Sequence, residues 1–312
     1  MKALIVLCIS VAAASAQGGG AVVGAGYHTF APISVAPGQV ITVFVTGIGN
    51  VTQKYSAGNL PLPTTLGGIS ASLNELGVIT APAPILAVFP FSACNNKVST
   101  QPCGTITAVT LQIPFELQPN TPRRSGPPFL AFLTISDQLG HAASMELSPV
   151  FDQIHVVDFF DTILGGDMSQ PGSGGGVVTH ADGSLVSFSK PAQPGEELVI
   201  YAVGLGATNP PVKTGAASPA PPVPTAQIFF LNFDYRQNAR PMPPIMSPFF
   251  SSPSPVFVGL TPGFAGLYQI NFVVPIPAER VAPCTDGANN LTVTIAGASF
   301  DGVAICVGPT VP

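Results

Sequence analysis

Four side chains able to bind metals or move protons recur every three residues in the middle of the chain: Asp152, His155, Asp158 and Asp161. Carboxylates and an imidazole are suitable ligands for a divalent cation. A three-residue step, however, stays on one face only in a helix, where it drifts, and it alternates between faces in a strand. We therefore interpret these residues as solvated or boundary side chains and predict no metal site.

A second group, His180, Asp182 and Ser184, contains the three side-chain types of a hydrolase triad. Triad members converge from distant elements, and no Gly-x-Ser-x-Gly turn accompanies these residues. Their spacing around an Asp-Gly pair instead predicts a hairpin whose turn is stabilised by Asp182. The glycines of 174–176 and 204–206 open no recognisable helix and lack the lysine of a phosphate-binding loop, so we interpret them as linker and turn glycines. We expect no catalytic residue and no cofactor.

Four cysteines follow the N-terminal segment: Cys94, Cys103, Cys284 and Cys306. An even number in an exported chain favours disulfides, and four cysteines allow three connectivities. Because two lie in each half of the chain, we predict that Cys94 pairs with Cys103 and Cys284 with Cys306. Neither pair has the short spacing of a zinc site, and no histidine lies near either pair.

A proline-rich loop between Pro241 and Pro255 contains several large apolar residues. If these side chains pack under the rim of a sheet, they form a small satellite core. If they are exposed, they form an apolar patch of the kind that contacts a partner or a carbohydrate. The candidate partner-binding residues of this loop are Met242, Met246, Phe249 and Phe250.

The N-terminus predicts export from the cell. Residues 1–16 combine one basic residue, a short apolar stretch and small residues ahead of Gln17, which is typical of a secretory signal peptide cleaved after Ala16. Later apolar runs are interrupted by Pro, Gly or Thr before they reach the length of about 20 residues that a membrane span needs. We expect a secreted or cell-surface protein whose mature chain does not insert into a membrane.

The charge pattern argues against a nucleic-acid partner. Charged residues make up 8% of the chain and the formal net charge is −5, whereas soluble domains typically contain about 25% charged residues. The basic residues are scattered, with only Arg123 and Arg124 adjacent, so the clustered positive surface that phosphate backbones require is missing.

A repeat organises the chain. Ala-Pro-Gly-Gln at 36–39 returns as Gln-Pro-Gly-Glu at 193–196, and Leu-Gln-Ile-Pro-Phe at 111–115 resembles Tyr-Gln-Ile-Asn-Phe at 268–272. Both matches have the same separation (194 − 37 = 157 and 269 − 112 = 157). Two matches at one separation predict a duplicated module.

The elements of each module are predicted to be short strands. Apolar residues alternate with polar ones in 111–117, 268–274 and 291–295, the last with its threonines facing outward. Turn signals such as Asp182-Gly183 and Asp301-Gly302 separate the strands, and 35 prolines and 33 glycines leave little room for long helices. We predict an all-β chain of two tandem sandwiches. The expected parts are a signal peptide (1–16), an N-terminal leader (17–30), domain 1 (31–152), a linker (153–176) that begins as a last strand or a short docking helix, and domain 2 (177–312).

The segment 191–210, with its Gly204-Leu205-Gly206 turn, resembles an uncharacterised C-terminal domain family of secreted acidobacterial proteins, the Solibacter C-terminal domain. The likeness extends to 178–186, 260–272 and 299–307, and in the first half to 62–69. This resemblance implies a secreted bacterial protein with immunoglobulin-like modules. The fold class is therefore expected to be all-β, with two tandem immunoglobulin-like β-sandwich domains. The family implies no reaction, ligand or catalytic residue.

Together these features predict a secreted, non-enzymatic protein with a role in surface structure, adhesion or extracellular matrix interaction. Its expected partner is an extracellular polysaccharide or a surface protein. A carbohydrate-binding module is the alternative, with the loops of the second half as its contact surface. A secreted hydrolase is the third hypothesis, because a fold alone does not exclude chemistry.

Overall fold

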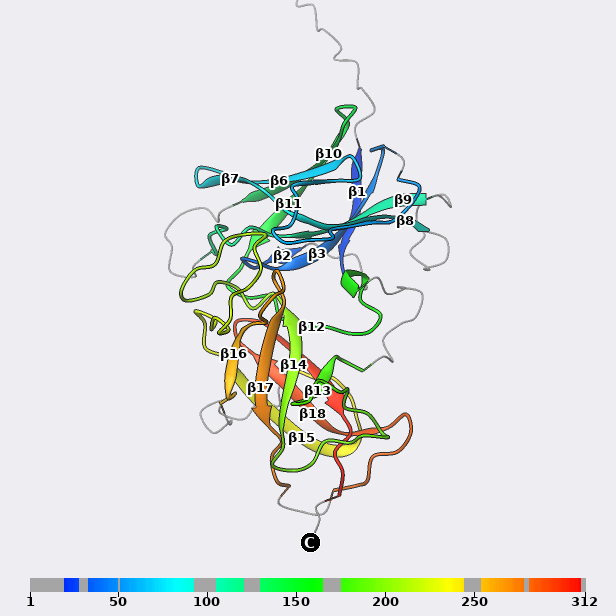
Figure 1. The fold of residues 1–312 in the computed structure, drawn as a ribbon, viewed down its shortest axis with the longest axis vertical. Coiled ribbons are helices and arrows are strands. Elements are labelled where there is room, and N and C mark those ends of the chain that lie inside the picture. The colour runs from blue at the N-terminus through cyan, green and yellow to red at the C-terminus, as the bar shows by residue number, and fades with distance from the viewer. Residues whose placement is uncertain are drawn as a thin grey trace, which may run out of the picture.

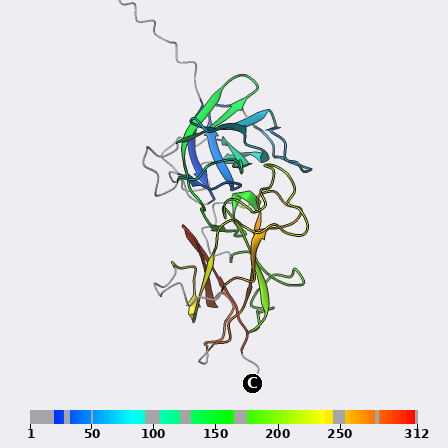
Figure 2. The same cartoon turned by 90° about the vertical axis from the view of Figure 1, so that its left-hand side faces the viewer.

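The computed structural model describes residues 20–27, 33–49, 51–92, 105–120, 130–164, 175–243, 254–277 and 281–309. Its regular elements are strands, apart from the 3-10 helix η1 (Thr162–Leu164), and they form two β-sandwich halves stacked along the long axis (Figure 1). The view turned by 90° shows the same end-to-end arrangement (Figure 2). Among the described residues, no helix is long and apolar enough to cross a membrane.

The first half consists of two packed sheets. One contains, in spatial order, β1 (Ala21–Gly26), β3 (Val40–Thr46), β9 (Thr105–Gln112), β8 (Ile85–Ser92) and β4 (Tyr55–Ser56). The other contains β2 (Ser34–Val35), β11 (Ala142–Pro149), β10 (Ala131–Asp137), β6 (Ile69–Glu75) and β5 (Thr65–Leu66), with β7 (Ile79–Pro82) paired to β6. Alternation builds the core: Ile69, Ala71 and Leu73 of β6 are buried, while the residues between them are less so.

The second half repeats this layout with fewer strands. One sheet contains β12 (His155–Val156), β14 (Glu197–Val203), β17 (Tyr268–Val273) and β16 (Phe257–Leu260), with β13 (Val178–His180) also paired to β14. The other contains β15 (Phe230–Ala239), β18 (Asn289–Ala296) and β19 (Phe300–Ile305). Each half has its own cluster of buried apolar residues, so the chain has two separate cores.

The two halves share details of local geometry. Gly38 and Gly195 both have positive φ angles, of 74° and 84°. In both turns the following side chain accepts a hydrogen bond from the backbone three residues earlier: Ala36 N–H donates to Gln39, and Gln193 N–H to Glu196, each at 2.8 Å. The first sequence match of the repeat therefore corresponds to the same structure in both halves.

The second sequence match does not align in space. Val43 of β3 pairs with Val109, whereas the equivalent Ile200 of β14 pairs with Ile270, a separation of 161 residues between partners (270 − 109 = 161). The strand predicted over 111–117 ends at Gln112, because Pro114 has no N–H with which to continue the ladder. The similar sequences at 111–115 and 268–272 are thus offset by four residues from the positions that are equivalent in the two structures.

Two expected boundaries are corrected. Residues 21–26, assigned to a leader, form β1 and pair with β3, in the register Ala21 with Thr46. In the same way His155, assigned to the linker, belongs to β12 and pairs with Val203 of β14. Each half is therefore completed by the stretch of chain that leads into it. The first part of the expected linker thus contains a strand, but one that pairs with the second half and not with the first, and the 3-10 helix η1 follows it.

The junction between the halves is packed. Val40, Val157 and Val203 form a buried apolar cluster, joined by partly buried side chains such as Tyr27 and Ile163. Two buried hydrogen bonds cross it. Gly215 N–H of the second half donates to Gln112 Oε1 of the first half at 2.8 Å, and the Thr162 hydroxyl of η1 donates to the Thr42 hydroxyl of β3 at 2.9 Å. This burial and bonding hold the halves in one arrangement.

Candidate binding cleft

His155 lies where the connecting segment crosses the junction. Its Nε2 lies 2.8 Å from Asp161 Oδ2, and its Nδ1 lies 3.5 Å from Asp301 Oδ2. The Tyr27 ring of the first half stacks on the imidazole, with centroids 3.8 Å apart and planes 6° from parallel. The imidazole is therefore held by two carboxylates and one aromatic face.

The two carboxylates determine the charge of the imidazole ring. Burial by itself lowers the pKa of His155, but the hydrogen bonds and negative charges of Asp161 and Asp301 outweigh it and raise the pKa to about 9. His155 is consequently an imidazolium at neutral pH. Burial also raises the pKa of the Tyr27 phenol well above its usual range, so the stacked partner stays neutral.

The three-residue series does not converge on one point. Asp152 turns to the β18–β19 hairpin, where its carboxylate accepts hydrogen bonds from Ala298 N–H and from the N–H and hydroxyl of Ser299, at 2.6 to 2.8 Å. Asp158 accepts a hydrogen bond from Phe160 N–H. In the parts of the chain that the structure describes, no three His, Cys, Asp or Glu side chains group in a way that could hold a metal ion.

A cleft of about 510 Å³ opens beside His155, between the connecting segment and the sheet of β15, β18 and β19. Its polar side chains are His155, Asp158, Asn238, Arg240, Asn289 and Asp301, and several of its remaining residues are glycine or alanine. A volume of this size is within the range of about 300–1,000 Å³ common for small-molecule sites.

One wall of the cleft contains an irregular strand. The pairing of β15 with β18 shifts register between Tyr235 and Ala239, a bulge-like irregularity that we call the bulge, and Asn238 within it has a positive φ of 55°. Bulges occur often beside functional sites, where they redirect side chains. Here the bulge brings Asn238 and Arg240 to the cleft.

The second candidate group does not form a triad. The His180 imidazole pairs with Glu196, with Nδ1 and Oε1 2.5 Å apart, and its Nε2 lies 3.2 Å from the Lys190 carbonyl. Its contact with Ser184 is through the backbone, where His180 N–H donates to the Ser184 carbonyl at 2.9 Å. Asp182 accepts hydrogen bonds from the N–H and hydroxyl of Ser184 and forms an ion pair with Lys190 at 2.7 Å. These contacts lower the pKa of Asp182, chiefly through Lys190, and they stabilise an exposed turn.

The glycines have packing roles. A Cβ on Gly204 or Gly206 would run into the backbone oxygen of Gln153 or Phe151, so the connecting segment can lie against this turn only where side chains are absent. Gly175 and Gly176 line the cleft. Gly174 lies outside the described residues.

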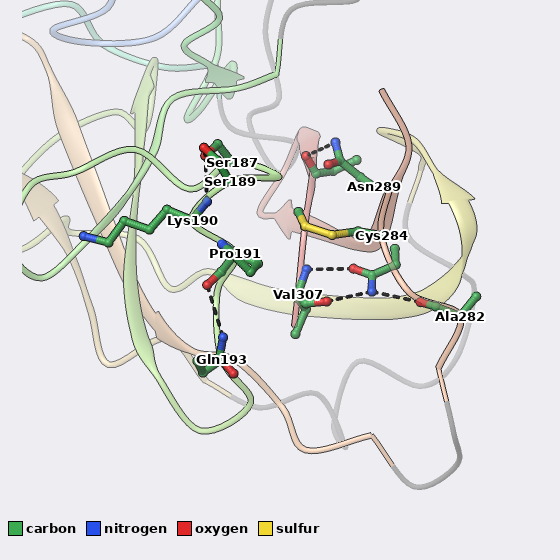
Figure 3. Close-up of a disulfide and its surroundings, with 12 residues drawn as sticks. Ser187, Ser189, Lys190, Pro191, Gln193, Ala282, Cys284, Asn289 and Val307 are labelled. Atoms are coloured by element: carbon green, nitrogen blue, oxygen red, sulfur yellow. Dashed lines mark hydrogen bonds between the residues drawn. A yellow bond between two sulfur atoms is a disulfide. The ribbon is translucent and has the colours of Figure 1, made fainter. Parts of the chain in front are cut away.

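The Cys284–Cys306 pair forms a disulfide, as predicted (Figure 3). Nearby, the Asn290 amide donates to the carbonyls of Ala282 and Val307, and Val307 N–H donates back to it. The disulfide closes a loop with a sequence separation of 22 residues, which in the loop-entropy account stabilises by about 3 kcal/mol. Cys94 and Cys103 lie outside the described residues.

Met242 is the one candidate of the partner loop that the structure describes; Met246, Phe249 and Phe250 lie outside the described residues. Met242 is 39% exposed, and its carbonyl accepts a hydrogen bond from the Thr294 hydroxyl. Thr292 likewise donates to the carbonyl of Arg240. The start of this loop therefore covers the outer face of β18, and the threonines expected to face solvent are buried.

Comparison with known proteins finds no family model and no curated sequence that matches this chain. The resemblance to the Solibacter C-terminal domain family stays a prediction.

Sequence reasoning singled out His155 and Asp158 but did not place Tyr27, Asn238, Arg240 or Asp301 beside them. Asp301-Gly302 was interpreted as a turn, yet it lies within β19. The only available signal was local: Arg240 is one of few basic residues in a chain with 8% charged residues.

Proposed function

We propose that this chain is a secreted, non-enzymatic protein of two tandem immunoglobulin-like modules that binds an extracellular polysaccharide or surface protein, in surface structure, adhesion or matrix interaction. The shared strand order and the packed junction support this proposal, because they suit a rigid element that presents a surface at a fixed geometry. The predicted signal peptide and the disulfide agree with an exported protein.

The observation that carries the non-enzymatic part is the state of His155. A general base must be unprotonated near the working pH and able to reach a substrate proton. His155 is an imidazolium with a pKa of about 9, and both of its ring nitrogens face carboxylates. This geometry supports a structural role for the imidazole in the cleft.

The test is a binding and activity screen on the secreted protein. Sedimentation with insoluble polysaccharides, with extracellular matrix preparations and with producing cells should retain the protein. Parallel incubation with ester, glycoside and peptide substrates should release no product. Hydrolysis of any substrate above the level of a denatured control would contradict the proposal, and so would the absence of binding to all of the polymer and cell preparations.

A carbohydrate-binding module is the second candidate. The polar cleft favours it, because carboxylate, amide and guanidinium groups there suit hydroxyl-rich ligands. The loop residues Phe249 and Phe250 remain a separate candidate surface. Retention on polysaccharide that is unchanged in a Phe249→Ala, Phe250→Ala double variant would remove the loop from this role.

A further inference from the structure

We propose that the cleft between the connecting segment and the β15–β18–β19 sheet binds a neutral saccharide through hydrogen bonds alone. The inference rests on the proposed binding function and names its ligand class and location. Its premises are the charge balance, the hydrogen-bonding groups and the shape of the cleft.

The charges of the cleft balance along its lining. Among the lining residues, His155 and Arg240 are positive and Asp158 and Asp301 are negative. The charge of His155 is also paired with Asp161, which does not line the cleft. An anionic ligand would gain from one pair and be repelled by the other, and a cation would meet the same cancellation. A neutral ligand that both donates and accepts hydrogen bonds can bond to Arg240 and Asp301 without an uncompensated charge, whereas both ring nitrogens of His155 already face carboxylates.

Several lining groups have hydrogen-bonding capacity left for a ligand. Asn289 donates its side-chain amide to the Ala304 carbonyl, which leaves its oxygen as an acceptor. Arg240 is exposed, and its guanidinium has no hydrogen bond or ion pair with another described residue. Asp301 accepts bonds from Val156 N–H and Gly302 N–H and also faces His155 Nδ1 at 3.5 Å, which leaves part of the capacity of about four that a carboxylate has. Donor and acceptor groups therefore face the same space.

The shape of the cleft also fits a compact polar ring. Small residues on the lining, among them Gly176, Gly287 and Ala288, leave it open, and a Cβ on Gly287 would meet nothing within 4 Å. The bulge holds Asn238 in a left-handed conformation, which non-glycine residues adopt at a cost of order 1 kcal/mol or more and which recurs at binding sites.

The lining contains no Phe, Tyr or Trp side chain. Recognition there would consequently depend on hydrogen bonds and not on stacking of a sugar over an aromatic ring. The absence of tryptophan from the sequence is no obstacle to this mode of binding.

Saturation-transfer NMR on the purified chain tests the inference with four disaccharide probes of similar size. Maltose and cellobiose are neutral, digalacturonic acid is anionic, and the glucosamine dimer is cationic. We expect saturation transfer to at least one neutral disaccharide and weaker or no transfer to the charged ones. Transfer only to a charged probe, or to none of the four, would overturn the proposal.

Matched variants locate the site. Ala288→Phe fills the cleft and should abolish the signal, whereas Ala181→Phe, on an exposed turn that does not line the cleft, should leave it unchanged. Arg240→Ala should weaken binding about tenfold or more, since a hydrogen bond to a charged group contributes about 1.5–3 kcal/mol. Lys213→Ala removes the same charge from an exposed loop and should have no effect. Thermal unfolding checks that each variant is folded.

The outcomes separate this inference from the proposed function. Equal neutral-sugar binding by wild type, Ala288→Phe and Arg240→Ala would refute the cleft as the site. Retention on polymer or cells by those variants would leave the broader binding function intact. If Ala288→Phe fails to fold, the comparison of Arg240→Ala with Lys213→Ala decides.

Discussion

The same turn occupies two different environments in the two halves. At the junction, Gln39 is buried, accepts a hydrogen bond from Ala36 N–H and donates one to the Tyr27 hydroxyl at 3.0 Å. At the far end of the second half, the equivalent Glu196 is partly exposed and pairs with His180. Where the halves meet, the position holds a neutral amide that donates and accepts. Where the end of the molecule faces water, it holds a carboxylate with an imidazole partner.

The hairpins at the ends of the halves differ in a related way. Asp137 of the first half belongs to its own hairpin and accepts hydrogen bonds from Leu139, His141 and Gly49 N–H groups. The β18–β19 hairpin of the second half is held instead by Asp152, from the connecting segment. The second half therefore depends on the chain that leads into it. The junction is part of the fold of the second half.

Removal of the Asp152 carboxylate should break this dependence with the largest effect. Asp152→Ala removes a buried carboxylate that accepts three hydrogen bonds from Ala298 and Ser299. Because a hydrogen bond to a charged group contributes about 1.5–3 kcal/mol, we expect a loss of about 3 to 5 kcal/mol in the free energy of unfolding. Asp137→Ala should cost less, because two of its three backbone donors, Leu139 and His141, belong to its own exposed hairpin, where water can replace the lost acceptor without separating distant segments. Urea titration of both variants gives the comparison, and an equal loss in the two would contradict it.

Alanine substitutions at the equivalent glycines, Gly38 and Gly195, compare the packing around the two turns. A Cβ on Gly38 would overlap the Phe115 ring, whereas one on Gly195 would meet nothing within 4 Å. Both substitutions incur the left-handed cost of about 1–2 kcal/mol. Gly38→Ala adds overpacking of about 1–3 kcal/mol, so its total should be about 2 to 5 kcal/mol. Denaturant midpoints measure both, and a Gly195→Ala cost equal to that of Gly38→Ala would mean that the ring moves away freely.

The pH dependence of stability should report the His155 contact. Its pKa is raised from about 6.5 in the unfolded chain to about 9 in the folded protein. The contribution is therefore complete below about pH 6.5 and is lost as the pH rises through about 9. The shift corresponds to a stabilisation of up to about 3 kcal/mol. Unfolding free energies measured from pH 6 to 10 should fall in the wild type and change much less in His155→Gln; parallel curves would exclude the imidazolium as the cause.

The contribution of Asp137, in the first half, to the pH dependence of stability has the opposite sign. Burial tends to raise its pKa, but hydrogen bonds from His141, Gly49 and Leu139 lower it to about 2. Its contribution is complete above about pH 4 and is lost as the pH falls through about 2. Acid titration of the wild type and Asp137→Asn should therefore diverge above pH 4 and converge toward pH 2, and a constant gap over that range would contradict this reason.

Local sequence signals predicted the all-β class and the paired turns, because Pro-Gly pairs and two-residue alternation act within a few residues. The prediction of a strand over 111–117 was wrong beyond Gln112, since side-chain alternation does not show where ladder hydrogen bonds stop. β1 was missed because its Ala-Val-Val-Gly-Ala-Gly sequence lacks alternation and acquires its structure by pairing with β3.

Such local signals could not predict the cleft. Its lining comes from five stretches, around His155, Gly176, Arg240, Ala288 and Asp301, that only the fold brings together. The three-residue spacing of 152–161 misled in part, because Asp152 and Asp158 have their own backbone partners while Asp161 and the distant Asp301 share His155.

Exchange of the two turn residues tests most directly whether the junction demands a neutral side chain. Gln39→Glu places a carboxylate in a buried position without a cation and removes the bond to Tyr27, so we predict a loss of about 3 to 5 kcal/mol at pH 7, with partial recovery at pH 4 as the carboxylate is protonated. Glu196→Gln should cost less than about 1 kcal/mol. Equal costs in the two variants by thermal unfolding, or no recovery at pH 4, would contradict the account.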